Sequence, residues 1–184
     1  MKSILALALL TVFNCTISTS FAQEGFTNKA EAANGFNKEG LKQGKWIAYY
    51  TDRESNTDTT TQDQASYYTL AVYKGGKPYG RMKKFDMSGN LVSEYRYNDG
   101  KLNEIRKYHD NGRLYIEVPY DDGKKNGLAK EYYESGILMS ETIYFNGRKN
   151  GVEKFYHRDG KIKSETWYHD GRQGETKYYE DWKE

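Results

Sequence analysis

The sequence repeats itself every 23 to 24 residues from about Lys74 to the C-terminus. Two series of glycines mark each unit, and a glutamate and a tyrosine return in step with them. The four series are Gly89, Gly112, Gly136 and Gly160; Gly76, Gly100, Gly123, Gly147 and Gly171; Glu94, Glu117, Glu141 and Glu165; and Tyr73, Tyr97, Tyr120, Tyr144 and Tyr168. Self-similarity at this period indicates supersecondary units that are stable only when stacked on their neighbours. Such arrays offer a long binding surface more often than a catalytic pocket.

The composition fits a thin, tyrosine-rich structure. Only 36% of the residues are hydrophobic, but 15% are aromatic and 18 are tyrosine. Disordered chains are poor in aromatic residues, so disorder is not favoured. Tyrosine can bury its ring and keep its hydroxyl in water, which suits a structure without a thick core. The net charge is +2 and the charges are interleaved, so nothing indicates a nucleic-acid partner.

Each unit is expected to be a β-hairpin. The first turn of each carries Ser88-Gly89, Asn111-Gly112, Ser135-Gly136 or Asp159-Gly160. Asn-Gly and Asp-Gly favour two-residue turns in which both residues take positive φ. With such turns throughout, a base falls opposite an acid in every unit: Lys83 with Glu94, Arg106 with Glu117, Lys130 with Glu141, and Lys154 with Glu165. One opposed pair contributes only about 0.2–1 kcal/mol, so this ladder serves mainly to fix strand register.

The same register assigns side chains to the two faces of a sheet. It predicts Phe85, Tyr108, Tyr132 and Tyr156 on the face of the ladder, and Leu91, Leu114, Leu138 and Ile162 on the opposite face. The hairpins join through Asp99-Gly100, Asp122-Gly123, Asn146-Gly147 and Asp170-Gly171. We therefore predict an all-β fold, an elongated antiparallel meander of repeated β-hairpins. Glu104 replaces an expected glycine, where we expect an altered or strained backbone, and Pro119 should remove one ladder bond.

The repeats divide the chain into segments. Residues 1–22 are the expected signal peptide, and residues 23–42 a linker or loosely attached arm. Residues 43–79 form a first, expanded repeat with an inserted loop at 52–66, which is polar and expected to be mobile. Residues 80–173 hold four regular repeats, and residues 174–184 a terminal half-repeat.

The N-terminus has the features of a targeting signal. Lys2 precedes an apolar stretch from Ile4 to Phe13, and small residues follow up to Ala22. The stretch is too short to span a bilayer as a helix. We expect cleavage near Ala22 and a mature protein without a transmembrane segment, either secreted or in the periplasm or cell envelope. The only cysteine, Cys15, lies inside this segment, and a lipid anchor on it is the alternative.

The repeat pattern resembles a known family. One unit has Asn126-Gly127, Tyr132, Gly136, Leu138, Glu141, Tyr144 and Gly147-Arg148, and the next has Asn150-Gly151, Tyr156, Gly160, Ile162, Glu165, Tyr168 and Gly171-Arg172. This pattern resembles the bacterial MORN-variant repeats from about Gly40 to the C-terminus. The resemblance implies an elongated all-β sheet, an interaction role and no catalytic residues. Proteins with this array are commonly labelled antitoxins of the YwqK-like group, which would normally act in the cytoplasm, whereas we expect this chain to be exported.

No constellation of catalytic, cofactor-binding or metal-binding residues stands out. His109 and His157 share a repeat position with Asp86 and Tyr133, which is typical of a tolerant surface position. Successive ladder glutamates lie two strands apart, roughly 9–10 Å, and each faces a cation. A structural ladder therefore explains these glutamates better than the paired acids of a glycosidase.

A row of tyrosines is the remaining candidate surface: Tyr108, Tyr132, Tyr156 and Tyr178. These rings either stack on a ligand or pack within the sheet itself, and the two uses are compatible. We expect a non-enzymatic exported interaction protein that binds a protein partner along one sheet face and needs no cofactor. The alternatives are a surface carbohydrate or peptidoglycan binder that uses this row, and an antitoxin-like inhibitor if the N-terminus is retained.

Overall fold

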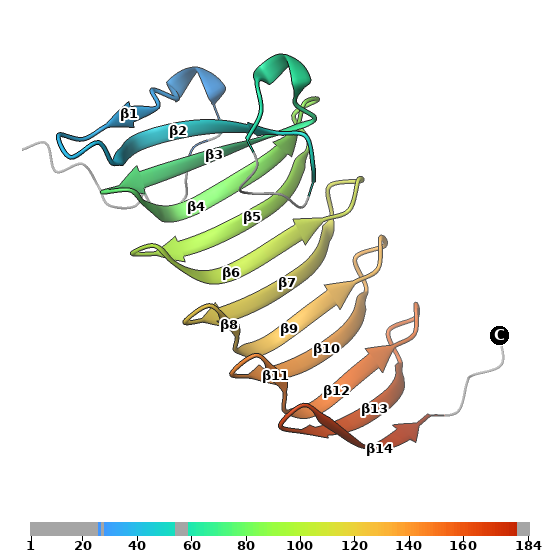
Figure 1. The fold of residues 1–184 in the computed structure, drawn as a ribbon. Helices are drawn as coiled ribbons and strands as arrows, with labels where there is room; N and C mark the ends of the chain where they lie inside the picture. The colour runs from blue at the N-terminus through green and yellow to red at the C-terminus, as the bar shows by residue number, and fades with distance from the viewer. Residues whose placement is uncertain (1–25, 27, 54–58, 180–184) are drawn as a thin grey trace, which may run out of the picture.

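The structure, a computed structural model, describes residues 26, 28–53 and 59–179. These residues form one antiparallel sheet of fourteen strands with two short 3-10 helices. Figure 1 shows the strands following one another in a twisted, curved ribbon, with the first and last strands at opposite ends. The predicted all-β meander is therefore confirmed. The expected signal peptide and Cys15 lie outside the described residues.

The strands follow chain order across the sheet. The 3-10 helices are η1 (Lys29–Glu31) and η2 (Gln62–Gln64). The strands are β1 (Gly35–Phe36), β2 (Lys42–Tyr50), β3 (Tyr67–Lys74), β4 (Lys77–Asp86), β5 (Leu91–Asn98), β6 (Lys101–Tyr108), β7 (Leu114–Asp121), β8 (Lys124–Lys125), β9 (Gly127–Tyr132), β10 (Leu138–Phe145), β11 (Arg148–Lys149), β12 (Gly151–Tyr156), β13 (Ile162–His169) and β14 (Arg172–Tyr178). The short strands β8 and β11 pair only with β7 and β10, at one end of these longer strands.

Two kinds of turn alternate along the meander. The turns that join one hairpin to the next are two-residue turns, as at Asp99 (φ 46°) and Gly100 (φ 79°), where both residues have positive φ. The turns inside the hairpins are different, and the prediction of two-residue loops was wrong there. Asp86 and Asn90 are bonded across a three-residue loop, and of its residues only Gly89 has positive φ. This is the hairpin built on a tight turn followed by a left-handed glycine.

The ladder register nevertheless agrees with the prediction, because a second irregularity compensates for the first. The three-residue loop shifts the pairing by one residue, and one extra residue on the second strand shifts it back. These extra residues, each skipped by the pairing, are Val92, Tyr115, Met139 and Lys163. Such β-bulges insert one unpaired residue and bend the strand locally.

The bulges overturn one face assignment. Leu91 pairs with Phe85 and packs in the same cluster, so it lies on the face of the ladder. Its counterparts in the other repeats pair in the same way: Leu114 with Tyr108, Leu138 with Tyr132, and Ile162 with Tyr156. The extra residue between the turn and the ladder reverses the alternation that the sequence pattern assumed. We call the face that carries Lys83 and Glu94 the ladder face.

The N-terminal segment packs on the ladder face and is not a loosely attached arm. Phe26 is buried with Tyr68, Leu70 and Phe85, and Ala32 packs against this cluster. Two residues after Ala32, the side chain of Asn34 accepts a hydrogen bond from Ile47 N at 2.8 Å and donates to Ile47 O at 3.1 Å. Phe26, Ala32 and the hydrogen bonds of Asn34 together dock this segment on the sheet. A second, smaller cluster of Ala71, Met82 and Tyr95 lies on the opposite face.

Glycines that follow Asn126 and Asn150 interrupt two strands. Gly127 (φ 112°) and Gly151 (φ 107°) have positive φ, and the strand is divided before each of them. The strand register places Asn103, and not Glu104, at the repeat position of Gly127 and Gly151, because each of these residues lies three residues before a ladder base. Neither Asn103 nor Glu104 has positive φ, so the expected strain is not found, and β6 runs through both residues unbroken. Pro119 lies beside the break before Gly127, where β7 pairs with neither β8 nor β9, in keeping with a lost ladder bond.

Candidate interaction surfaces

A row of alternating charges crosses the ladder face from β4 to β14. Strand pairing sets each glutamate between two basic residues, one on its own hairpin and one on the next strand. The row runs Lys83, Glu94, Arg106, Glu117, Lys130, Glu141, Lys154, Glu165 and Lys177. Ion pairs of 3.5–3.8 Å close in three of the four hairpins: Lys83 with Glu94, Arg106 with Glu117, and Lys154 with Glu165. The predicted pairing of bases with acids is confirmed as strand register.

The hydroxyl groups of the ladder-face tyrosines bind these glutamates. Each hydroxyl donates to a carboxylate of the preceding hairpin, at 2.7–2.9 Å: Tyr108 to Glu94, Tyr132 to Glu117, Tyr156 to Glu141, and Tyr179 to Glu165. Burial, followed by this hydrogen bond, raises the pKa of Tyr132 and Tyr156 to about 12 and raises the pKa of Tyr108 as well. The bonds therefore join successive hairpins along the array.

The tyrosine row that the sequence offers as a binding surface is thus largely engaged within the sheet. Tyr108, Tyr132 and Tyr156 are half-buried with their hydroxyls bonded. Tyr178 does not belong to the row: it aligns with Phe155 in the preceding repeat, pairs with Ser164 and is 75% exposed. Tyr179 takes the row position instead.

Side chains beside the three-residue turns also connect each hairpin to the next. His109 Nε2 lies 2.9 Å from Tyr132 O, and Tyr133 Oη donates to Tyr156 O at 2.7 Å, each 23 residues further along. The histidine position is therefore a hydrogen-bonding position and not merely a tolerant surface position. The common offset of 23 residues is the signal that could have identified it. In the described part of the chain, no three His, Cys, Asp or Glu residues are grouped as a metal site.

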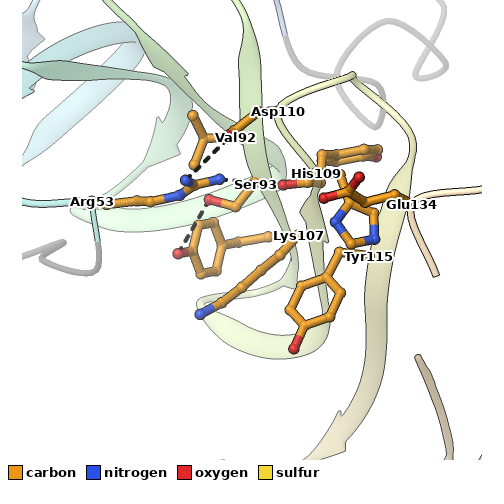
Figure 2. Close-up of a pocket in the computed structure, with 10 residues that line it drawn as sticks. Arg53, Val92, Ser93, Lys107, His109, Asp110, Tyr115 and Glu134 are labelled. Atoms are coloured by element: carbon orange, nitrogen blue, oxygen red, sulfur yellow. Dashed lines mark hydrogen bonds and ion pairs between the residues drawn. The ribbon is translucent and has the colours of Figure 1, made fainter. Parts of the chain in front are cut away.

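A cleft of about 380 Å³ lies at the turn ends of β5 and β6, beside the inserted loop. Figure 2 shows its lining, which includes Arg53, Lys107, Asp110 and Glu134. The Arg53 guanidinium donates to Tyr108 O at 3.2 Å and pairs with Asp110 at 3.3 Å. The two cations and two anions balance, so the cleft has no net charge that would select an ionic ligand.

The first residues of the inserted loop are bound to the sheet. Lys84 is fully buried on the opposite face, where its ammonium donates to Asp52 O at 2.9 Å and lies over the Tyr50 ring at 4.7 Å. The next residue, Arg53, reaches the turn after β6, where its guanidinium contacts Tyr108 O and Asp110. The loop was expected to be mobile, whereas its start is held by hydrogen bonds and by a cation–π contact.

Apolar side chains gather on the ladder face of the last repeats. Leu128 faces Ile143 across β9 and β10, and Val152 faces Trp167 across β12 and β13. The Ile143 side chain extends over the next hairpin, where a Cβ built on Gly151 would lie 3.3 Å from Ile143 Cδ1. The two pairs are therefore neighbours.

Three of these four residues are unusually exposed for their type. Leu128 and Ile143 are each 41% exposed and Trp167 is 43% exposed. Phe145, two residues beyond Ile143 on the same face, is 58% exposed. We call Leu128, Ile143, Phe145, Val152 and Trp167 the apolar patch.

The repeat itself does not require apolar residues at these positions. The first two regular repeats hold charged residues or proline there: Arg81 and Glu104 where Leu128 and Val152 stand, and Arg96 and Pro119 where Ile143 and Trp167 stand. Sequence reasoning missed the patch because it followed the residues that stay constant between repeats. The informative signal is the change from charged to apolar at one repeat position.

Comparison with known families identifies three of the hairpins. The MORN repeat variant family matches residues 101–122, 125–146 and 149–170. Each match spans the two long strands of one hairpin and the three-residue turn between them. No curated protein matches the chain. Within the described ranges, no helix is long and apolar enough to cross a membrane. The chain therefore contains three consecutive MORN-variant repeats, and repeats of this kind suggest a repeat-based interaction module.

Proposed function

We propose that this chain is a non-enzymatic, exported interaction protein that binds a protein partner through the apolar patch. The observation that carries the proposal is the exposure of Ile143 and Trp167 at positions where the same repeat elsewhere uses Arg96 and Pro119. Contiguous exposed apolar side chains with a polar rim are typical of protein-binding surfaces. Tryptophan is also among the residues that dominate binding energy at such surfaces.

The charge row supplies the polar rim. Lys130, Glu141, Lys154 and Glu165 each lie two residues from a patch residue on the same strand, and therefore on the same face. A partner that covers the patch meets an apolar centre bordered by alternating charges, which is the usual anatomy of a protein interface. The charges set orientation and specificity more than affinity.

The N-terminal half of the molecule offers an internal precedent for such binding. There the ladder face is covered by Phe26, which is buried against Tyr68 and Phe85. At the patch, the described residues provide no comparable cover. The ladder face therefore carries an added apolar segment at the N-terminal end of the sheet. In the described structure the apolar patch has no such segment over it.

Export rests on the N-terminal sequence, from Lys2 to Ala22, which lies outside the described residues. Mass spectrometry of the native N-terminus tests this part of the proposal, because a chain that begins at Gln23 has been processed. A chain that retains Met1 would instead favour the antitoxin-like alternative. The carbohydrate alternative relied on the row of Tyr108, Tyr132 and Tyr156, whose hydroxyls donate to glutamates.

The binding proposal is tested by capture of partners from the cell-envelope fraction with the wild type and two variants. The patch variant is Leu128→Arg with Ile143→Arg, which copies the residues of the first regular repeat and should fold. The matched control is Arg81→Ala with Arg96→Ala at the same repeat positions. We expect one protein to be captured by the wild type and the control and lost with the patch variant. Equal capture by all three chains, or no reproducible capture, contradicts the proposal.

A further inference from the structure

The last strand, β14, has an open edge in the described structure. It runs for seven residues and pairs with β13 on one side only. At the other end of the sheet the outer edge of β2 is covered: Ala33 N donates to Lys45 O, the side chain of Asn34 binds Ile47, and β1 pairs with Lys42 and Gln43. An uncovered edge strand presents unpaired backbone groups that can accept another strand.

The backbone groups of Thr176 point to this open edge. Tyr179 N donates to Lys163 O, so Tyr179 bonds inward to β13. Along a strand the bonding direction alternates, so Lys177 also bonds inward, whereas Thr176 and Tyr178 direct their N–H and C=O groups outward. A second strand can therefore form hydrogen-bonded pairs at these two residues.

The sequence of this edge is self-complementary. Read against a second copy in the antiparallel direction about Thr176, Glu175 falls opposite Lys177. The pairing of β14 with β13 is irregular at Gly174 and Glu175, because Thr176 pairs with Thr166 whereas Gln173 pairs with Tyr168, so the regular part of the edge runs from Thr176 to Tyr178. Glu175 and Lys177 are both exposed, so both charges are available at the edge. Tyr178 is 75% exposed, so its ring is available to a second strand. We propose that two copies of this chain join through β14 in this register.

This pairing also continues the charge row. Lys177 ends the row, with Glu165 as its only strand neighbour in the described chain. In the pair, Glu175 of the second copy occupies the place where the next glutamate of the array would stand. Charged residues on an edge strand normally discourage pairing, because like charges meet in most registers. Here the register centred on Thr176 brings opposite charges together on both sides of the symmetry axis, so it is selected over its neighbours.

Sedimentation of charge variants over a range of concentrations tests this register. Glu175→Lys and Lys177→Glu each bring like charges together twice per pair, so each alone should weaken self-association by about tenfold or more. Mixed in equal amounts, the two variants are complementary and should form a mixed dimer. Circular dichroism checks that both remain folded. A wild type that stays monomeric, or a mixture that associates no better than its components, overturns the proposal.

A cysteine placed on the symmetry axis gives an independent readout. Thr176→Cys, in a Cys15→Ser background, sets two thiols opposite each other at a spacing that a disulfide can bridge. Asp110→Cys is the control, since its side chain is 95% exposed but lies far along the array from β14. We expect rapid covalent dimers from the first variant only. Equal rates in the two variants contradict the proposed axis.

Discussion

Removal of one inter-hairpin hydroxyl tests the structural role of the tyrosine row. Tyr132→Phe deletes the 2.9 Å hydrogen bond to Glu117 and keeps the ring. Hydrogen bonds to charged groups contribute about 1.5–3 kcal/mol. Glu117 keeps Arg106 at 3.6 Å and is not left unpaired, so we expect the lower value, a loss of about 1.5 kcal/mol. For a chain of this size that lowers the midpoint of thermal unfolding by about 3–6 °C.

The same bond predicts how stability depends on pH. The folded state raises the pKa of Tyr132 to about 12 from an ordinary value of 10.0, because burial and the bond to Glu117 favour the neutral hydroxyl. The stabilisation is fully present below pH 10 and is lost as the pH rises toward 12. The stability difference between wild type and Tyr132→Phe should therefore shrink across this interval.

Urea unfolding, followed by circular dichroism at several pH values, measures both effects. Tyr178→Phe is the matched control, because this hydroxyl belongs to a ring that is 75% exposed and lies outside the row. This control substitution should change the free energy of unfolding by less than about 0.5 kcal/mol. A Tyr132→Phe chain as stable as this control at pH 7 would refute the assignment of the row to structure.

Other substitutions test separate parts of the fold. Phe26→Ala should lower the free energy of unfolding by about 3 kcal/mol in urea titrations, whereas no change would mean that the N-terminal segment is loosely attached. Gly171→Ala introduces a side chain at φ 81° and should cost about 1–2 kcal/mol, seen as a lower thermal midpoint; an unchanged midpoint contradicts the turn geometry. The hydrogen bond from Tyr179 is the main interaction that lowers the pKa of Glu165. Tyr179→Phe removes this bond, so NMR titration should find the pKa of Glu165 closer to its ordinary value, and Tyr178→Phe should leave it unchanged.

The period of the sequence was sufficient to predict the meander and the charge register. Lys83 does pair with Glu94, although the turn between them is a three-residue loop and not the predicted two-residue one. The observed register agrees with the predicted one because the bulge at Val92 reverses the one-residue shift that the loop introduces. A bulge has no strong residue signature, since Val92, Tyr115, Met139 and Lys163 share no chemistry. The faces of Leu91 and its counterparts could therefore not be derived from alternation alone.

The features that define the surfaces depend on contacts between segments far apart in the sequence. Nothing in the local sequence of Phe26 indicates that it is buried against Phe85. The bonds from Tyr132 to Glu117 and from His109 to Tyr132 O cross between hairpins, so they require the offset between neighbouring repeats and not the hairpin alone. The apolar patch, in contrast, can be read from an alignment of the repeats, since it is a change of chemistry at fixed positions.

Photocrosslinking from the patch tests the functional proposal most directly. In one chain p-benzoylphenylalanine replaces Trp167, and in the control it replaces Arg96, which holds an equivalent position in the first regular repeat. After irradiation of intact cells, crosslinked products are separated and identified by mass spectrometry. The account predicts one discrete protein adduct from the Trp167 position and none from the Arg96 position. Equal labelling from both positions, or adducts from Arg96 alone, would contradict it.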